Sequence, residues 1–112
     1  MTFLDAIGRQ EGFFVHDSRA AKNNNPGNIE YGEFARAHGA TGSDGRFAIF
    51  PDADAGFAAL KALFELPDYR NLTIAEALHR YAPSNENDTA LYIHNVCMWV
   101  GCLSTAIVST LL

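Results

Sequence analysis

"KNNNPGNIEYG", residues 22–32, contains four asparagines, one proline and two glycines within eleven positions. A surface connection needs far less, because one Pro or Gly together with one Asx side chain already makes a turn. The excess of turn-forming and hydrogen-bonding residues therefore indicates a ligand or a second structural role. The segment also divides the chain, since the residues before it and those after residue 51 follow helical periodicity.

The flanking segments predict short helices around a small β region. The first helix, 2–11, opens with Thr2 and Asp5 in capping-box spacing and stops at Gly12. Further helices are predicted over 52–66, 72–82, 87–101 and 104–112. Strands are predicted over 28–34 and 45–50, inside a β region of about 22–51, with the turn signal "SDG" before the second strand. Residues 1–112 thus predict one mainly helical α+β domain with a small β-hairpin.

The charge and hydrophobicity of the chain argue against several partner classes. The net charge is −5 and the eight Lys and Arg residues are scattered, which disfavours nucleic acid or an anionic membrane surface as the main partner. No segment approaches the roughly 18 consecutive apolar residues of a membrane span. The N-terminus carries no basic segment followed by an apolar run, so no signal peptide is visible. We expect no membrane insertion, and the oligomeric state stays open.

The cysteines and histidines predict no metal site and no cofactor. Cys97 and Cys102 lie five residues apart, a spacing that fits neither a CxxC redox pair nor a zinc site. We expect two small buried hydrophobic side chains there, with a local disulfide as the alternative. The four histidines are spread along the chain without metal-ligand spacing, and no Gly-rich phosphate loop follows a strand.

Glu11 is the first candidate for catalysis. It lies at the C-terminus of the predicted first helix, where the helix dipole disfavours a carboxylate, and Phe13, Phe14 and Val15 follow it closely. Both the dipole and desolvation by these neighbours would raise the pKa of the Glu11 carboxyl. A raised carboxyl pKa is what a general acid needs near neutral pH. The alternative is a solvated glutamate at a helix end with no chemical role.

Three separated motifs resemble a known family in their order and spacing. They are "QEGFF…SRAAKNNNPGNIEYG", "HGATGSDGRFAIFPDADAGFAAL" and "YAPSNENDTALYIHNV". Together they resemble the phage-type branch of the lysozyme-like superfamily, which contains peptidoglycan-cleaving muramidases and lytic transglycosylases. The resemblance covers residues 3–101. It implies a helical domain with a small β-hairpin, a saccharide cleft between them, and one essential glutamate at the end of the first long helix, which matches Glu11.

The same motifs supply the candidate substrate-binding residues. Amide, carboxyl and aromatic side chains are the usual wall of a sugar site. The candidates are Asn25, Asn28, Tyr31, Phe47, Tyr81, Glu86, Asn87 and Tyr92. Glu86 and Asn87 would contact the substrate or orient Glu11. Alternatively, the asparagines near residue 25 form an Asx-capped turn, Tyr81 belongs to the core, and Asn87 with Thr89 caps a helix.

Asp17 and Asp44 are the candidates for a second catalytic carboxylate. Either would hold a water as general base at about 6.5–9.5 Å from the acid, or act as a nucleophile at about 5–5.5 Å. Asp44 precedes a glycine, so the alternative is that it only organises a turn. If neither aspartate is in reach, the resemblance implies transglycosylation, in which the 6-hydroxyl of the muramic acid closes on its own anomeric carbon.

The sequence therefore predicts a muramidase that cleaves the MurNAc–GlcNAc β-1,4 bond of peptidoglycan glycan strands, with Glu11 as general acid. The first alternative is a lytic transglycosylase that leaves 1,6-anhydro-MurNAc ends. The second is a catalytically silent glycan-binding or structural module of a phage or secretion apparatus. The expected place of action is the bacterial cell wall, in the periplasm or outside the cell, by a delivery route that the sequence does not reveal.

Overall fold

Seven α-helices, one pair of strands and one 3₁₀ helix make up the structure, a computed structural model that describes residues 1–112. In chain order they are α1 (Phe3–Gln10), α2 (Arg19–Lys22), α3 (Glu33–Ala37), β1 (Gly42–Ser43), β2 (Ala48–Ile49), α4 (Ala53–Glu65), α5 (Pro67–Arg70), α6 (Ile74–Tyr81), α7 (Thr89–Val100) and η1 (Val108–Leu111). This content confirms the predicted α+β, mainly helical fold. None of the helices combines the length and apolar character that crossing a bilayer requires.

Side-chain caps fix where the longer helices begin. One side chain caps each of three helices by accepting a backbone N–H from its first turn: Thr2 caps α1, Asp52 caps α4 and Asp88 caps α7. Thr73 and Glu76 bond reciprocally as a capping box at the start of α6. These contacts satisfy N–H groups that a helix start otherwise leaves unpaired. The four longer helices therefore lie close to their predicted positions.

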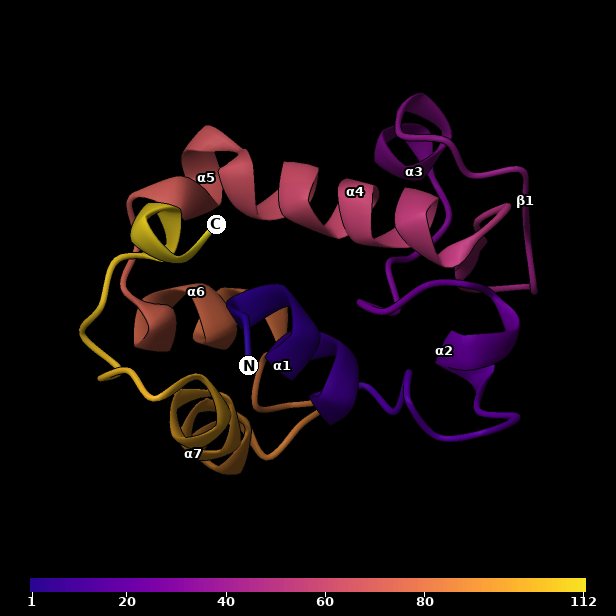
Figure 1. Cartoon of the computed structure of the whole chain (residues 1–112). Helices are drawn as coiled ribbons and strands as arrows, with labels where there is room; N and C mark the ends of the chain where they lie inside the picture. Colours follow the sequence, from indigo (N-terminus) through magenta and orange to yellow (C-terminus); the bar gives the residue numbers. More distant parts are fainter.

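The core lies between α4, α1, α6 and α7. In Figure 1, α4 runs along the top, α1 and α6 lie centrally, and α7 closes the lower side, so α1 packs against both α4 and α7. Phe3 meets Phe64 edge to face with their ring centroids 5.0 Å apart. The other large side chains that are fully buried in this core are Ile7, Leu60, Ile74, Leu78 and Val96. Each of the four longer helices thus contributes apolar side chains to one core.

The β region differs from the prediction in its first strand. Asn28 has a left-handed φ of 47°, and only Glu30 pairs, in an isolated antiparallel bridge with Phe47. Glu33 then begins α3, because the run from Glu33 to Ala37 consists largely of good helix formers. The hairpin lies instead wholly within residues 42–49, where β1 pairs with β2. The turn signal "SDG" located the hairpin, but the strand predicted over 28–34 is wrong.

The C-terminal segment also differs from the prediction of a helix over 104–112. Only Val108–Leu111 forms a 3₁₀ turn. The carbonyl of Ser104 accepts the N–H of Ala75 at 3.0 Å, and the carbonyl of Ala106 accepts the N–H of Ile74 at 2.9 Å. These are N–H groups of the first turn of α6, which lack partners inside their own helix. Residues 102–107 therefore stay non-helical because their carbonyls serve α6.

The asparagine-rich segment is held to the hairpin by a buried amide. Asn25 is fully buried, and its Nδ2 donates to the carbonyls of Ile29 and Ala48 at 2.9 Å each. Its Oδ1 accepts the N–H of Ile29 at 3.0 Å. These three bonds use the hydrogen-bonding capacity of the amide almost completely. Asn25 therefore shapes the loop and joins it to β2, as the Asx-turn alternative predicted.

A close backbone approach seats the same loop on α4. Gly56 faces the loop, and a Cβ at this position would overlap the carbonyl oxygen of Asn24 and lie 2.8 Å from Cδ of Pro26. Gly27, in the loop itself, lies close to α4 and α6, since a Cβ there would lie 2.5 Å from both Leu60 Cδ1 and the Tyr81 hydroxyl. Gly56 therefore requires the absence of a side chain, because the atom that a Cβ would overlap belongs to the backbone. These contacts fix how closely the loop approaches α4, and so they fix its position beside the end of α1.

We expect Gly56→Ala to lower the free energy of unfolding by about 2 kcal/mol or more, because the overlapping atom belongs to backbone that cannot rotate away. Gly8→Ala, in α1, is the matched control, since its Cβ would meet neighbours only at 3.5–3.6 Å. Helix propensity alone favours alanine at both sites by about 0.5–1 kcal/mol. Urea unfolding of the two variants measures the difference, and equal stabilities would contradict the close approach.

Candidate active site

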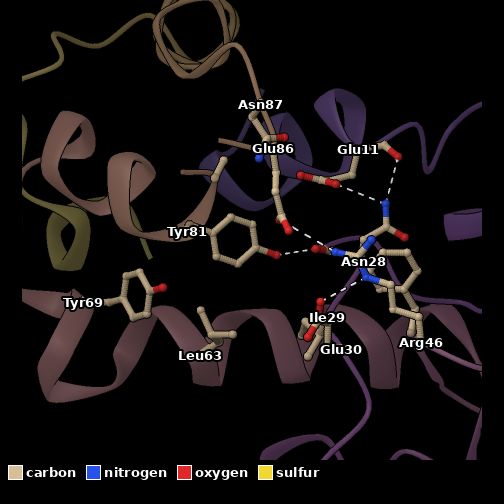
Figure 2. A pocket seen from close by; sticks show the side chains of 13 residues that line it. Glu11, Asn28, Ile29, Glu30, Arg46, Leu63, Tyr69, Tyr81, Glu86 and Asn87 are labelled. Atoms are coloured by element: carbon tan, nitrogen blue, oxygen red, sulfur yellow. Dashed lines mark hydrogen bonds and ion pairs between the residues drawn. The ribbon is translucent and has the colours of Figure 1, made fainter. Parts of the chain in front are cut away.

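Glu11 lies where α1 ends, on the wall of the main cavity. It is the C-cap of α1, and Gly12 follows with a φ of 83° that ends the helix. The cavity has a volume of about 590 Å³ (Figure 2). Its lining residues are Glu11, Gly27, Asn28, Ile29, Glu30, Arg46, Phe47, Leu63, Tyr69, Tyr81, Ala82, Glu86 and Asn87. Residues from all three motifs thus meet at one cavity that contains Glu11.

Two side chains hold the two oxygens of the Glu11 carboxylate. Tyr92, on α7, donates its hydroxyl to Oε2 at 2.7 Å. Asn28 donates its Nδ2 to Oε1 at 3.1 Å and to the Glu11 carbonyl at 3.4 Å, as drawn in Figure 2. The Oδ1 of Asn28 is buried and has no hydrogen-bond partner. The carboxylate is therefore fixed in position by groups that lie far apart in the sequence.

Burial raises the pKa of Glu11, while the hydrogen bonds from Tyr92 and Asn28 oppose the rise because they favour the charged form. The direction confirms the prediction. The source of the burial is partly different, however, since Phe14 and Val15 are themselves 58% and 61% exposed and bury little of their neighbours. Tyr92 is 2% exposed, so its packing against the carboxylate contributes to the burial instead.

Asp44 organises the hairpin turn and lies outside the cavity lining. Its carboxylate accepts from the N–H groups of Arg46 and Phe47, from Asn23 Nδ2, and from Arg19 through Nε at 2.5 Å. The hydrogen bond from Arg19, followed by that from Asn23, holds the pKa of Asp44 far below its ordinary value. A carboxylate whose oxygens are saturated in this way has little capacity to activate a water. The turn alternative is confirmed by these bonds, and a catalytic role for Asp44 is not supported by its position.

Asp17 also lies outside the cavity lining. Its side chain is 72% exposed and sits 3.4 Å from the imidazole of His16, with a backbone φ of 61°. The left-handed conformation points to a turn residue, which Asp tolerates better than most side chains. The prediction of a catalytic role for Asp17 is therefore not supported by its position.

Five of the eight predicted substrate-binding residues line the cavity, and three do not. Asn28, Phe47, Tyr81, Glu86 and Asn87 are in the lining. Asn25 is buried beneath the loop, Tyr31 lies on the surface under Arg36, and Tyr92 is buried behind Glu11. The positions of Asn25 and Tyr92 therefore indicate structural or positioning roles, and the predicted contact of Tyr31 with substrate is not supported by its place outside the cavity lining.

The aromatic lining residues also carry structural contacts. Phe47 lies between the guanidinium groups of Arg19 and Arg46, at 4.5 and 4.8 Å from its ring centre. Tyr81 packs against Phe64 with ring centroids 5.0 Å apart and donates its hydroxyl to the Gly27 carbonyl. Tyr81 thereby joins α6 to the asparagine-rich loop, as its core alternative predicted, and still presents an edge to the cavity.

Arg46 and Glu30 are lining residues that the sequence analysis missed. Arg46 donates Nε to Glu30 at 3.0 Å, and its terminal nitrogen lies 3.7 Å from Glu86 (Figure 2). Glu86 and Asn87 were predicted to contact the substrate or to orient Glu11, and neither bonds Glu11, because Glu86 pairs with Arg46 and Asn87 bonds the Pro83 carbonyl. The available sequence signal was the pair of predicted strands, 28–34 and 45–50, which contain Glu30 and Arg46; the structure brings the two residues together through the bridge between Glu30 and Phe47.

We expect Tyr92→Phe to raise the pKa of Glu11 above its value in the parent protein, because the lost hydrogen bond favours the carboxylate. A carbon-13 NMR titration of the Glu11 carboxyl measures this. Tyr81→Phe is the matched control, since Tyr81 donates to Gly27 rather than to Glu11. A fall in the pKa of Glu11 in Tyr92→Phe, or an equal rise in both variants, would contradict the assignment.

Glu11→Gln should gain stability relative to the parent as pH rises. Because burial raises the pKa of Glu11, the folded state holds this proton more tightly than the unfolded chain. The parent therefore loses stability as pH rises from the unfolded pKa through the folded pKa, while glutamine does not titrate. Urea unfolding at about pH 3.5 and about pH 8 measures the change. The exposed Glu65→Gln is the control, and a Glu11→Gln difference that is the same at both pH values would refute the prediction.

No group of three or more His, Cys, Asp or Glu side chains is arranged to hold a metal ion. No protein-family model matches the chain, and no curated protein and no solved structure matches it either. The function must therefore be argued from the chemistry of Glu11 and its surroundings.

Proposed function

We propose that the protein is a glycosidase that cleaves the MurNAc–GlcNAc β-1,4 bond of peptidoglycan at the bacterial cell wall, with Glu11 as general acid. One observation carries the proposal: a single carboxyl group of raised pKa is held by Tyr92 and Asn28 on the wall of a cavity of about 590 Å³. Glycosidic cleavage needs such a group to protonate the leaving oxygen.

The cavity lining supports a saccharide ligand. Amide and carboxyl groups of Asn28, Glu30, Glu86 and Asn87 alternate with apolar surface from the lining Phe, Tyr, Leu and Ile residues. Such a mixture suits a sugar, which combines hydroxyl and acetamide groups with apolar ring faces. The convergence of all three family-like motifs on one cavity supports the same reading.

The arrangement favours transglycosylation over hydrolysis. Asp17 and Asp44 are outside the cavity lining, and the other lining carboxylates, Glu30 and Glu86, lie against Arg46. Glu11 is therefore the one lining carboxyl group without a cationic partner. In a one-carboxylate route, Glu11 protonates the leaving oxygen of GlcNAc as the bond to the anomeric carbon breaks. The 6-hydroxyl of MurNAc then bonds to that carbon and returns its proton to Glu11.

Tyr92 and Asn28 would serve both halves of this cycle. After the first proton transfer Glu11 is a carboxylate, and the two donors stabilise it while it waits for the second proton. Burial opposes the charge and so restores the tendency to take a proton back. The balance of these effects suits a group that must act first as an acid and then as a base.

The decisive test is the digestion of purified peptidoglycan with the parent protein and with Glu11→Gln, followed by mass analysis of the released muropeptides. We expect 1,6-anhydro-MurNAc ends from the parent and a loss of about 10²–10⁴-fold or more in Glu11→Gln. Glu65→Gln, an exposed glutamate on α4, should retain the parent activity.

The other outcomes separate the alternatives. Reducing MurNAc ends, absent from the variant, would keep the glycosidase proposal but replace transglycosylation with hydrolysis. No soluble product from parent protein that is folded by circular dichroism would overturn the enzyme proposal and favour a silent glycan-binding module.

A further inference from the structure

The two cysteines lie at defined positions in the cap that ends α7. Gly101 adopts a left-handed φ of 79°, and the N–H of Cys102 donates to the carbonyl of Cys97 at 3.1 Å. This is the six-to-one hydrogen bond of the Schellman motif. The motif characteristically brings the side chains of its first and last residues into contact, and here these residues are Cys97 and Cys102.

The side chains follow this expectation. Both cysteines are free and half-buried, and the Cys102 thiol lies near enough to Cys97 to help raise the pKa of that thiol. Both also line a second surface cavity of about 430 Å³, together with exposed Met98 and Leu103. The backbone thus holds two thiols together at a surface that a small reagent can reach.

We propose that Cys97 and Cys102 form a redox dithiol that closes to an intrachain disulfide by exchange with a small disulfide. One protein thiolate attacks the small disulfide, which forms a mixed disulfide and releases one small thiol. The second protein thiolate attacks the protein sulfur of that mixed disulfide and releases the second small thiol. The protein gives up two electrons, the small disulfide is reduced, and the two thiol protons end on the released thiols. This proposal is independent of the proposed function.

Burial, with the nearby Cys102 thiol adding to it, raises the pKa of Cys97 to about 11. Cys97 is therefore a thiol at neutral pH, and exchange should accelerate as pH rises, because the thiolate is the attacking form. The short backbone connection through the cap compensates, because the second thiol is already close to the mixed disulfide when the closing step begins.

Closure would tie α7 to the segment that caps α6. Residues 102–108 leave the cap of α7 and end at the buried Val108, and two of their carbonyls accept N–H groups from the first turn of α6. Nothing covalent joins this segment to α7 in the dithiol form except the backbone of the cap. A disulfide should therefore slow the local detachment of residues 102–108 from α6. The amide groups of Ile74 and Ala75 should then be exposed to solvent less often.

The test equilibrates folded protein with mixtures of reduced and oxidised glutathione, quenches with an alkylating reagent, and counts alkylated thiols by mass. We expect a product that has lost two hydrogens and carries no glutathione, with an effective molarity at least about tenfold above that of the same chain in urea. Hydrogen exchange at Ile74 and Ala75 should slow in the closed form.

Cys97→Ser and Cys102→Ser are the matched controls, and each should stop at the mixed disulfide. Accumulation of glutathione on both cysteines of the parent would overturn the proposal. Disulfide-linked dimers, or an effective molarity no higher than in urea, would overturn it as well.

Discussion

The Glu11 carboxylate and its two hydrogen bonds are the constraint on which the rest of the site depends. A carboxyl group withdrawn from water is tolerated only when donors meet it, and these donors come from opposite halves of the chain. Tyr92 reaches Glu11 because α7 packs on α1, and Asn28 reaches it because the loop is seated on α4 at Gly56. The helical core and the loop therefore have to be correct together for this one group to be placed.

Two asparagines of the asparagine-rich segment, Asn25 and Asn28, have different roles. Asn25 points into the fold and bonds only backbone groups of the loop and β2. Asn28, three positions later, turns outward through a left-handed conformation and meets the carboxylate. The excess of turn chemistry that the sequence displays is thus explained by a loop that must build itself and also serve a site.

Local sequence signals predicted the four longer helices and the position of Glu11 at the end of α1, because caps and glycines act within a few residues. Thr2, Thr73 and Gly101 fix helix ends in this way. The strand over 28–34 failed because a positive φ at Asn28 depends on the contact with Glu11, which lies 17 residues away. The role of Tyr92 could not be predicted for the same reason, since it lies 81 residues from its partner.

Arg46 and its two glutamate partners form a rim of the cavity that is held only by exposed ion pairs. Arg46 joins the hairpin to the segment before α7 through ion pairs to Glu30 and Glu86, and all three side chains are half exposed or more. Ion pairs of this kind are screened by salt and contribute roughly 0–1 kcal/mol each. The rim can therefore part under thermal motion without disturbing the buried base of the cavity. A ligand that passes this rim would therefore have to displace only weak, salt-screened ion pairs.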